Sequence, residues 1–466
     1  MASAVFDNGN FRRGNTYMAS ARRHLHLYGI AAIALGLLGF SAGSIATERR
    51  SGPEILPTIF VHGFAGSAAQ YQSQAMRFSS NGVPDDMILA FEYNTGSAAG
   101  IAAAVPNLDA FVDATRARFG VDRVNLVAHS LGTAISGTYL ANTVRAAKIS
   151  KYIGIDGASS PNCGSTAPGT LTCMGIFRGT AGNVAGNNVY FNDTQTHVES
   201  VTSAESFAAQ FQFLTGEAPR RTSIARDFGL IRVAGRVVDF PANTGAEGAT
   251  LELWRIGGIT GDRKYLSRRV TVAADGSWGP FLVLSGENYE FAVERPGSLV
   301  GHFYFQPWER STQLVRMNLS PPGSAILANT NTSEAHSSLV ITRQKEIWVN
   351  HPSGQNDTLT IQTFTRGRSQ PPVDVLLPLT DNSRIALHVH DDAATPQVSS
   401  LALLPFFPTQ PFQTGVDVFM PATERANGTI TLINAQRGNT SRLQIINVPN
   451  WPSSTDRISV IFDDHL

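Results

Sequence analysis

A serine in the first half of the chain has the sequence surroundings of a nucleophile. Ser130 stands in VNLVAHSLGT, after an apolar β-branched run and before a stretch with helical character. A nucleophilic serine needs a sharp strand-to-helix turn that lifts its hydroxyl clear of the sheet. The turn crowds the residues two before and two after it, and Ala128 and Gly132 are both small. The alternative is that Ser130 only caps the following helix.

A nucleophilic serine also needs a base, and one histidine has the required place. Residues 53–218 contain His62, His129 and His197. Only His197 comes after the helix that is expected to follow Ser130. In enzymes built around this turn the chain order is serine, acid, histidine, with the histidine on a late loop. We therefore predict that His197 is the base. The alternative is an ordinary histidine in a surface loop.

The acid that orients the base should lie between Ser130 and His197. Only Asp156 and Asp193 meet this condition. Asp156 ends the apolar run YIGIDG, and a carboxylate at a strand end is held rigidly, so it is the favoured acid. Asp193 lies four residues before His197 in the same loop and is the alternative.

Two backbone N–H groups are needed to stabilise an oxyanion in acyl transfer. One should come from Leu131, directly after the serine, where helix N–H groups are free. The other should come from Phe64 in VHGFAG, where Gly63 and Gly66 allow the backbone to bend. The alternative for this segment is a simple connection between a strand and a helix.

Strands and helices alternate along the segment that carries these residues. Non-alternating apolar strands separated by amphipathic helices predict a mostly parallel sheet with helices on both faces, over residues 53–218. The strands are expected at 57–63, 86–93, 122–129, 151–157, 173–179 and 187–193, and the helices at 66–82, 100–120, 131–149 and 203–216.

The helical period disappears after residue 225, and apolar residues then alternate with polar ones. This period of two predicts all-β sandwich or barrel domains. Residues 225–322 are weakly similar to transthyretin-like or carboxypeptidase-regulatory-like sandwiches. Residues 323–466 are predicted to form a second all-β domain, or the rest of a larger one.

Taken together, FVHGFAG, AHSLG and a lone late histidine resemble the α/β-hydrolase fold of bacterial lipases and esterases. With the β region added, the chain is similar to secreted lipases that carry a C-terminal β lipid-binding domain. In those enzymes the acid also lies on the strand that follows the turn of the nucleophilic serine, which agrees with Asp156. The resemblance covers about a third of the chain well and the remainder only by architecture.

The N-terminus and the cysteines indicate an oxidising compartment. Residues 1–46 have basic residues, an apolar run and a small-x-small ending, which predicts a cleaved secretory signal peptide. The alternative is an uncleaved anchor. Cys163 and Cys173 are the only cysteines and are expected to form a disulfide; two free thiols are the alternative. The protein should then be extracellular or periplasmic.

The composition and three short segments indicate which kinds of molecule the protein could bind. Lys+Arg and Asp+Glu both total 36, so nothing steers the chain toward nucleic acid. His388 and His390 share a strand face, but no third ligand is evident, so an exposed pair is expected, with no metal and no cofactor. The aromatic segments FYFQPWER and LLPFFPTQPF predict either core strands or an apolar surface that contacts lipid.

The expected activity is a secreted serine lipase or carboxylesterase acting on triacylglycerols or long-chain acyl esters at an interface. Fewer than twenty residues separate Asp156 from Met174, which leaves no room for a large cap. The cleft is then nearly lidless or partly covered by the β region. Two alternatives are an extracellular polyester depolymerase and a non-catalytic adhesion protein on a hydrolase scaffold.

Overall fold

The computed structural model describes residues 53–158, 163, 171–351, 354–365 and 368–463, which belong to one compact unit. The predicted signal peptide lies outside these residues. Within the described part, no helix combines the length and apolar character needed to cross a membrane.

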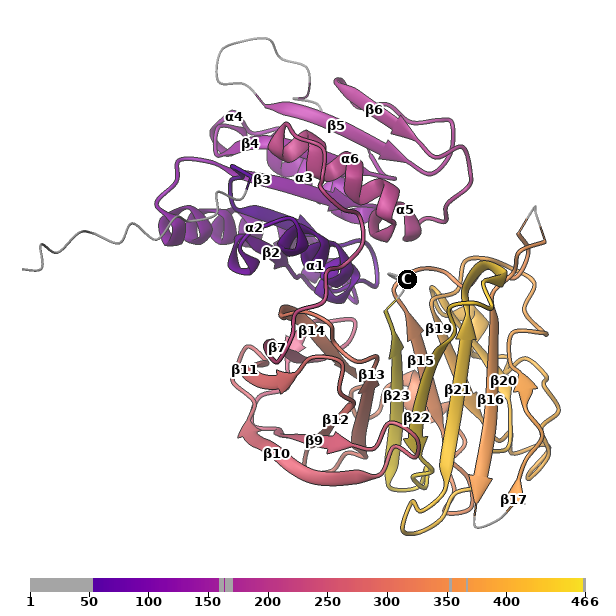
Figure 1. Ribbon diagram of the computed structural model, residues 1–466. Coiled ribbons are helices and arrows are strands. Elements are labelled where there is room, and N and C mark those ends of the chain that lie inside the picture. Colours follow the sequence, from indigo (N-terminus) through magenta and orange to yellow (C-terminus); the bar gives the residue numbers. More distant parts are fainter. Residues whose placement is uncertain (1–52, 159–162, 164–170, 352–353, 366–367, 464–466) are drawn as a thin grey trace, which may run out of the picture. The chain divides into compact units, whose positions relative to one another are not determined.

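The first part of the chain forms a six-stranded parallel sheet in the order β2-β1-β3-β4-β5-β6 (Figure 1). Every neighbouring pair in it is parallel. The strands are β1 (Thr58–Val61), β2 (Ile88–Phe91), β3 (Val124–His129), β4 (Ile149–Ile155), β5 (Thr172–Phe177) and β6 (Asn187–Tyr190).

Helices cover both faces of this sheet. A hydrophobic core lies between the sheet and the helices on each face. One core contains side chains of α2 and α3, and the other contains side chains of α1 and α6. The helices are η1 (Ala68–Tyr71), α1 (Gln72–Ser80), η2 (Asp85–Met87), α2 (Ala98–Phe119), α3 (Leu131–Leu140), α4 (Thr143–Ala146), α5 (Glu199–Thr202) and α6 (Ala204–Thr215).

One helix expected from the sequence is divided. The segment 131–149 was predicted as continuous, but α3 ends at Leu140 and α4 begins at Thr143. The cause is Asn142, whose side-chain oxygen accepts the N–H groups of Val144 and Arg145. An asparagine in this position caps a new helix and interrupts the old one.

The second part of the chain is all β, apart from short helical turns. An eight-stranded sheet has the order β10-β9-β12-β13-β23-β15-β19-β20, beside a sheet of β11, β7, β14 and β8 and another of β17, β16, β21, β22 and β18. The bounds are β7 (Leu230–Asp239), β8 (Thr244–Gly245), β9 (Thr250–Ile256), β10 (Arg263–Thr271), β11 (Ser277–Leu284), β12 (Tyr289–Glu294), β13 (Val300–Phe305), β14 (Thr312–Leu319), α7 (Ala325–Ala328), β15 (Leu339–Arg343), β16 (Thr358–Thr365), β17 (Arg368–Ser369), β18 (Val373–Asp374), β19 (Ala386–His390), η3 (Phe407–Thr409), β20 (Gln413–Asp417), β21 (Thr429–Ala435), η4 (Gln436–Gly438), β22 (Gln444–Pro449) and β23 (Asp456–Phe462).

The eight-stranded sheet packs on both faces. On β13, Phe303 and Phe305 belong to the core shared with β7, β11 and β14, whereas Tyr304 belongs to the core shared with β16, β21 and β22. Successive side chains of a strand point to opposite faces, so one sheet serves two sandwiches. The predicted fold class is confirmed. The boundary predicted at 322 stays a prediction, and the sheet continues across it because β13 pairs with β23.

One expectation for the β region is wrong, and one pair of alternatives is resolved in favour of the core. His388 and His390 are buried, not an exposed pair: His388 stacks on Phe407 with ring centroids 4.1 Å apart, and burial lowers the pKa of His388 to about 3. The aromatic segments lie mainly in the cores, because Phe303, Phe305, Trp308 and Phe407 are buried. These four side chains therefore form no exposed apolar surface.

Candidate active site

Ser130 occupies a strained turn between β3 and α3. Its backbone has φ 50° and ψ −120°, and its side chain makes no capping hydrogen bond. Non-glycine residues rarely adopt positive φ, and such strain gathers at functional sites. The turn presses α3 against the end of β1: a Cβ at Gly132 would lie 2.4 Å from the Val61 carbonyl oxygen. Only glycine fits there, whereas the methyl of Ala128 is accommodated in the core.

Asp156 and His197 are joined directly. His197 Nδ1 lies 2.5 Å from Asp156 Oδ2, and the two side chains are 22% and 14% exposed. Asp156 follows β4, and its own N–H donates to the Ile176 carbonyl on β5 at 2.7 Å. Its carboxylate also accepts the N–H of Arg178 and pairs with the Arg178 guanidinium at 3.2 Å. The carboxyl ends of β4 and β5 therefore fix the carboxylate of Asp156, which in turn holds the imidazole of His197.

Asp193, the alternative acid, is placed differently. Its side chain is exposed, and its backbone N–H donates to the Arg178 carbonyl. The hydrogen bond to His197 Nδ1 comes from Asp156. Of the two candidate acids, the structure brings only Asp156 to the histidine.

His129, beside Ser130 in the chain, links the turn of Ser130 to the loop between β6 and α5 that carries His197. This segment is called the histidine loop below. The Gln70 amide donates to His129 Nδ1 at 2.8 Å, so the ring proton sits on Nε2 and is donated to the His197 carbonyl at 3.0 Å. Burial, followed by the nearby charge of His197, lowers the pKa of His129. The neutral ring therefore keeps this hydrogen bond. The sequence alone assigns His129 no role, because its partners Gln70 and His197 lie far from it in the chain.

The loop after β1 has its own fixed geometry. The N–H of Gly66 donates to the Gly63 carbonyl at 3.2 Å, which closes a turn around Phe64. His62 accepts the Tyr93 N–H at Nε2, so its Nδ1 donates to the Gly63 carbonyl. Within the described part of the chain, the N–H groups of Phe64 and Leu131 have no acceptor. Both are available to a developing oxyanion.

The β region holds this loop from outside. Asn243, between β7 and β8, donates from Nδ2 to the Gly66 carbonyl at 3.0 Å and to the Tyr93 carbonyl at 3.1 Å. Its φ of 57° is the left-handed conformation that asparagine tolerates. Glu92, next to Tyr93, is paired with Arg236 of β7 and Arg316 of β14. The β region thus contacts the loop after β1 and the end of β2.

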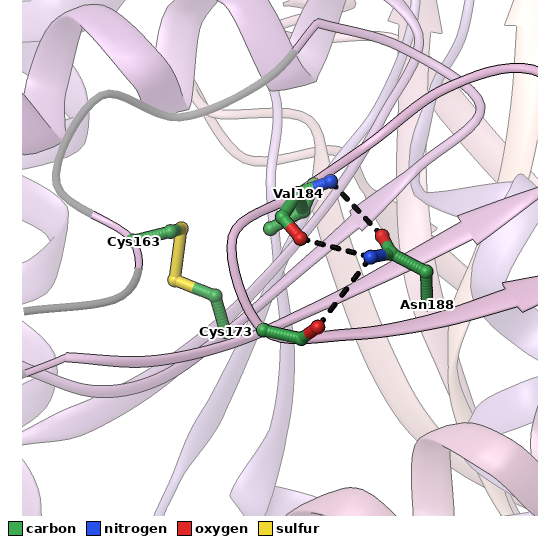
Figure 2. The surroundings of a disulfide bond; sticks show 5 residues. Cys163, Cys173, Val184 and Asn188 are labelled. Atoms are coloured by element: carbon green, nitrogen blue, oxygen red, sulfur yellow. Dashed lines mark hydrogen bonds between the residues drawn. A yellow bond between two sulfur atoms is a disulfide. The ribbon is translucent and has the colours of Figure 1, made fainter.

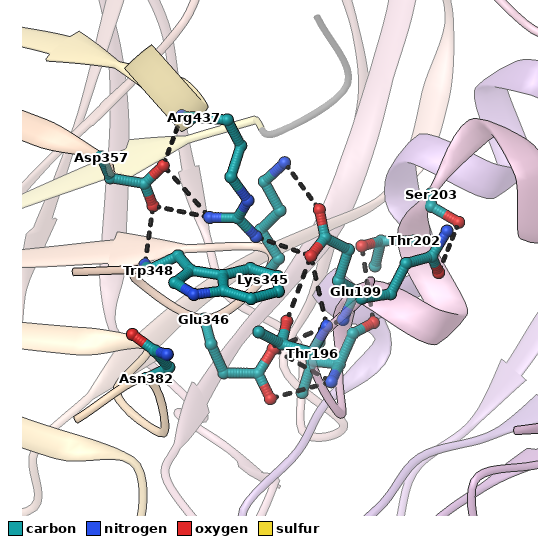
Figure 3. A network of polar contacts seen from close by, with 12 residues as sticks. Thr196, Glu199, Thr202, Ser203, Lys345, Glu346, Trp348, Asp357, Asn382 and Arg437 are labelled. Atoms are coloured by element: carbon teal, nitrogen blue, oxygen red, sulfur yellow. Dashed lines mark hydrogen bonds and ion pairs between the residues drawn. The ribbon is translucent and has the colours of Figure 1, made fainter. Parts of the chain in front are cut away.

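A second set of contacts reaches the histidine loop (Figure 3). Glu346 follows β15 and is fully buried; its carboxylate accepts the Val198 N–H at 2.8 and 3.0 Å and bonds Thr196 Oγ1 at 2.5 Å. These residues flank His197 on both sides. Burial raises the pKa of Glu346, and the donors oppose this shift only in part.

A buried ion network surrounds this contact. Glu199 on α5 pairs with Lys345 at 3.2 Å and with Arg437 at 2.6 Å. Burial would raise the pKa of Glu199, but these two cations outweigh it and leave the pKa lowered. Arg437 also pairs with Asp357 at 2.9 Å, as Figure 3 shows. Cations of the β region thus neutralise the carboxylate two residues after His197.

The predicted disulfide is present. Cys163 and Cys173 are bonded, with their Cα atoms 5.5 Å apart (Figure 2). Cys173 lies on β5, and the neighbouring loop is held by Asn188 of β6, which exchanges hydrogen bonds with the backbone of Val184 at 2.9 Å. The disulfide therefore ties Cys163 to β5.

Family models match three consecutive parts of the chain. Residues 56–156 match "Lipase (class 2)" and residues 229–322 match "Lipase C-terminal domain". A further model, described as a C-terminal domain, matches residues 325–466. Residues 56–156 are therefore similar to lipases of this class. The predicted resemblance to lipases with a C-terminal β domain is thereby confirmed, and no protein with a curated description matches the chain.

Solved structures resemble this chain only distantly. A mutant epoxide hydrolase from Bacillus megaterium is 20% identical over 23% of this chain and 37% of its own, with a TM-score of 0.17. A Bacillus licheniformis lipase in its propeptide form is 11% identical over 85% and 94%, with a TM-score of 0.26. The phospholipase PlaB from Legionella pneumophila is 12% identical over 57% and 94%, with a TM-score of 0.24. We draw nothing about activity from likenesses this low.

Proposed function

We propose that this protein is a secreted serine lipase or carboxylesterase that hydrolyses apolar carboxylic esters through an acyl-enzyme. The observation that carries the proposal is the Asp156–His197 hydrogen bond, anchored through His129 to the strained turn of Ser130. A strained serine, a histidine held by a carboxylate and two N–H groups without an acceptor among the described residues are the parts that acyl transfer requires. A helix-capping serine would explain none of this arrangement.

The steps follow from these groups. Ser130 Oγ attacks the ester carbonyl carbon while His197 Nε2 takes its proton, and Asp156 stabilises the imidazolium. The carbonyl oxygen becomes an oxyanion that accepts the N–H groups of Phe64 and Leu131. The ester C–O bond then breaks, and His197 returns the proton to the departing alcohol. Water attacks the acyl-enzyme in the same way and restores Ser130. This chemistry needs no cofactor.

Hydrolysis of p-nitrophenyl butyrate and p-nitrophenyl laurate tests the proposal. The wild-type protein should turn over both esters, and Ser130→Ala should lose about 10³-fold or more, since the serine, its base and the acid act as one unit. An exposed serine of the β region provides the control: Ser441→Ala should keep the wild-type rate. An aryl-ester phosphonate should label the wild type and not Ser130→Ala. Turnover that survives Ser130→Ala would contradict the proposal.

Contact with a lipid surface is part of the proposal. The disulfide fits an extracellular location. On β7 and β11, Leu230, Leu282 and Leu284 are 62%, 48% and 38% exposed, and Leu284 pairs with Leu230 across the sheet. Adjacent exposed leucines favour contact with an apolar interface. Leu282→Asp should therefore slow hydrolysis of an emulsified triacylglycerol and leave p-nitrophenyl butyrate hydrolysis unchanged; equal rates on the emulsion would argue against this contact.

A further inference from the structure

A cavity of about 420 Å³ lies in the β region and is lined by no residue of the candidate active site. It opens among β12, β13, β14 and β23, beside the short helix α7. Leu299, Phe303, Leu319 and Leu327 give it apolar walls. Ligand sites in proteins have this character, since they occupy about 300–1,000 Å³ and are mostly apolar with a few polar groups.

The cavity also contains a cation without a counter-ion. Arg457 on β23 lines it, and its Nη1 is buried with no hydrogen-bond partner. Within the described residues, no ion pair or side-chain hydrogen bond reaches this guanidinium. Burial lowers the pKa of Arg457 to about 10, so the group stays charged at neutral pH. Arg457 as a whole is half-buried, but its Nη1 is withdrawn from solvent, and a buried donor is costly unless it is paired.

A second arginine that lines the cavity has its charge paired with a carboxylate. Arg295 donates from Nη1 to both oxygens of Asp239, at 2.9 and 3.0 Å. The carboxylate of Asp239 is therefore committed to Arg295 and does not serve Arg457. On β14, Asn318 also lines the cavity, and its Oδ1 is buried with no partner. This oxygen can only accept hydrogen bonds, so it is the Nδ2 of the same amide that could donate to an anion held by Arg457.

We propose that this cavity binds the carboxylate of a single aliphatic chain, chemically a fatty acid. The guanidinium of Arg457 takes the carboxylate, which supplies the missing anion, and the methylene chain packs against the leucines and Phe303. Arginine is the side chain best suited to a carboxylate, because its planar fork can donate two parallel hydrogen bonds. The site does not depend on the proposed hydrolysis, although that reaction would release a ligand of this class.

The test measures binding to the full chain by calorimetry, with dodecanoate kept below its micellar concentration. Acetate carries the charge without the chain, and dodecanol carries the chain without the charge. Wild type should bind dodecanoate at least about tenfold more tightly than either. Arg457→Met should lose about tenfold or more of this affinity, since it removes the partner of a desolvated carboxylate. Arg425→Met, at an exposed arginine of the same region, should bind like wild type.

Thermal unfolding provides a second readout. Arg457→Met removes a half-buried cation whose buried Nη1 has no partner, so its Tm without ligand should equal or exceed that of wild type. Dodecanoate should raise the Tm of wild type and leave that of Arg457→Met unchanged. If Arg457→Met fails to fold, Arg457→Lys decides, since it keeps the charge but loses the fork and should bind several-fold more weakly. Equal binding of acetate or dodecanol, or dodecanoate binding unchanged in the Arg457 variants, would overturn the proposal.

Discussion

Replacing Glu346 by glutamine should slow the proposed hydrolysis while the protein stays folded. The carboxylate receives hydrogen bonds from Val198 and Thr196, on either side of His197, and a third N–H from Glu199 at 3.4 Å. A glutamine side chain has nearly the same shape but only one acceptor oxygen. Its NH₂ group would face an N–H donor, so at least one hydrogen bond to the histidine loop must break.

The size of the effect follows from that lost bond. A hydrogen bond to a charged group contributes about 1.5–3 kcal/mol, and about 1.4 kcal/mol corresponds to a factor of ten. The loop conformation that places His197 should therefore become less favourable by roughly 10- to 100-fold. We expect kcat for a soluble ester to fall by up to this factor, with KM changed less than about threefold, because the loop acts on the base and not on substrate binding.

Stability should move differently from activity. Because burial raises the pKa of Glu346, its folded-state pKa lies above the ordinary glutamate value. The stability linked to its protonation is present below that ordinary value and is lost as pH rises through the raised pKa. Glutamine does not titrate, so Glu346→Gln does not lose stability in this way as the pH rises. The free energy of unfolding of the variant minus that of wild type should therefore increase between about pH 4.5 and pH 7.

Steady-state kinetics and urea unfolding at pH 4.5 and 7 check both statements. Glu424→Gln, an exposed glutamate of the β region, is the matched control and should change neither quantity. The reasoning is refuted if Glu346→Gln keeps kcat within twofold of wild type while remaining folded. It is also refuted if the relative stability of the variant worsens as pH rises through this range.

Three further outcomes are expected. Asp156→Asn should lower the esterase rate by about 10³–10⁴, while Asp193→Asn should stay within twofold, and the opposite order in steady-state assays would exchange their roles. Gly132→Ala should lower the Tm and the rate together, because the added methyl meets a backbone carbonyl at 2.4 Å and overpacking costs about 1–3 kcal/mol; an unchanged Tm in calorimetry would contradict the described turn. Replacing Cys163 and Cys173 together by serine should lower the free energy of urea unfolding by about 2–3 kcal/mol, and reducing the wild type should give the same shift.

The fold of residues 53–218 could be predicted because its signals are local. Apolar runs of strand length and helices ended by Gly120 and Gly216 are visible in the printed sequence, and both glycines have the left-handed backbone of a helix end. The break at Asn142 is also a local signal, since asparagine is a strong N-cap, but it was outweighed by the continuing apolar period. The joining of β13 to β23 could not be predicted, because those strands are far apart in the chain.

The positioning residues around the site were harder to predict for the same reason. The serine, acid and histidine have an order and spacing that chemistry restricts. Glu346 belongs to RQKEIWVN, where a Lys-Glu pair ordinarily indicates a solvated surface. Asn243 stands in a turn, which explains it locally without reference to any site. Only the packing of the β region against the catalytic unit turns these two side chains toward the loops of the site.

These contacts change what a truncation of the β region would mean. If that region only captured lipid, its removal would spare soluble esters and abolish activity on emulsions. In this structure Asn243 donates to the loop after β1, which carries Phe64, and Glu346 accepts from the loop that carries His197. Truncation would leave Val198 without its acceptor and the Gly66 carbonyl without its donor, so soluble esters should lose activity too. Surface contact is therefore better tested at Leu282, because a change at that exposed side chain leaves both loops intact.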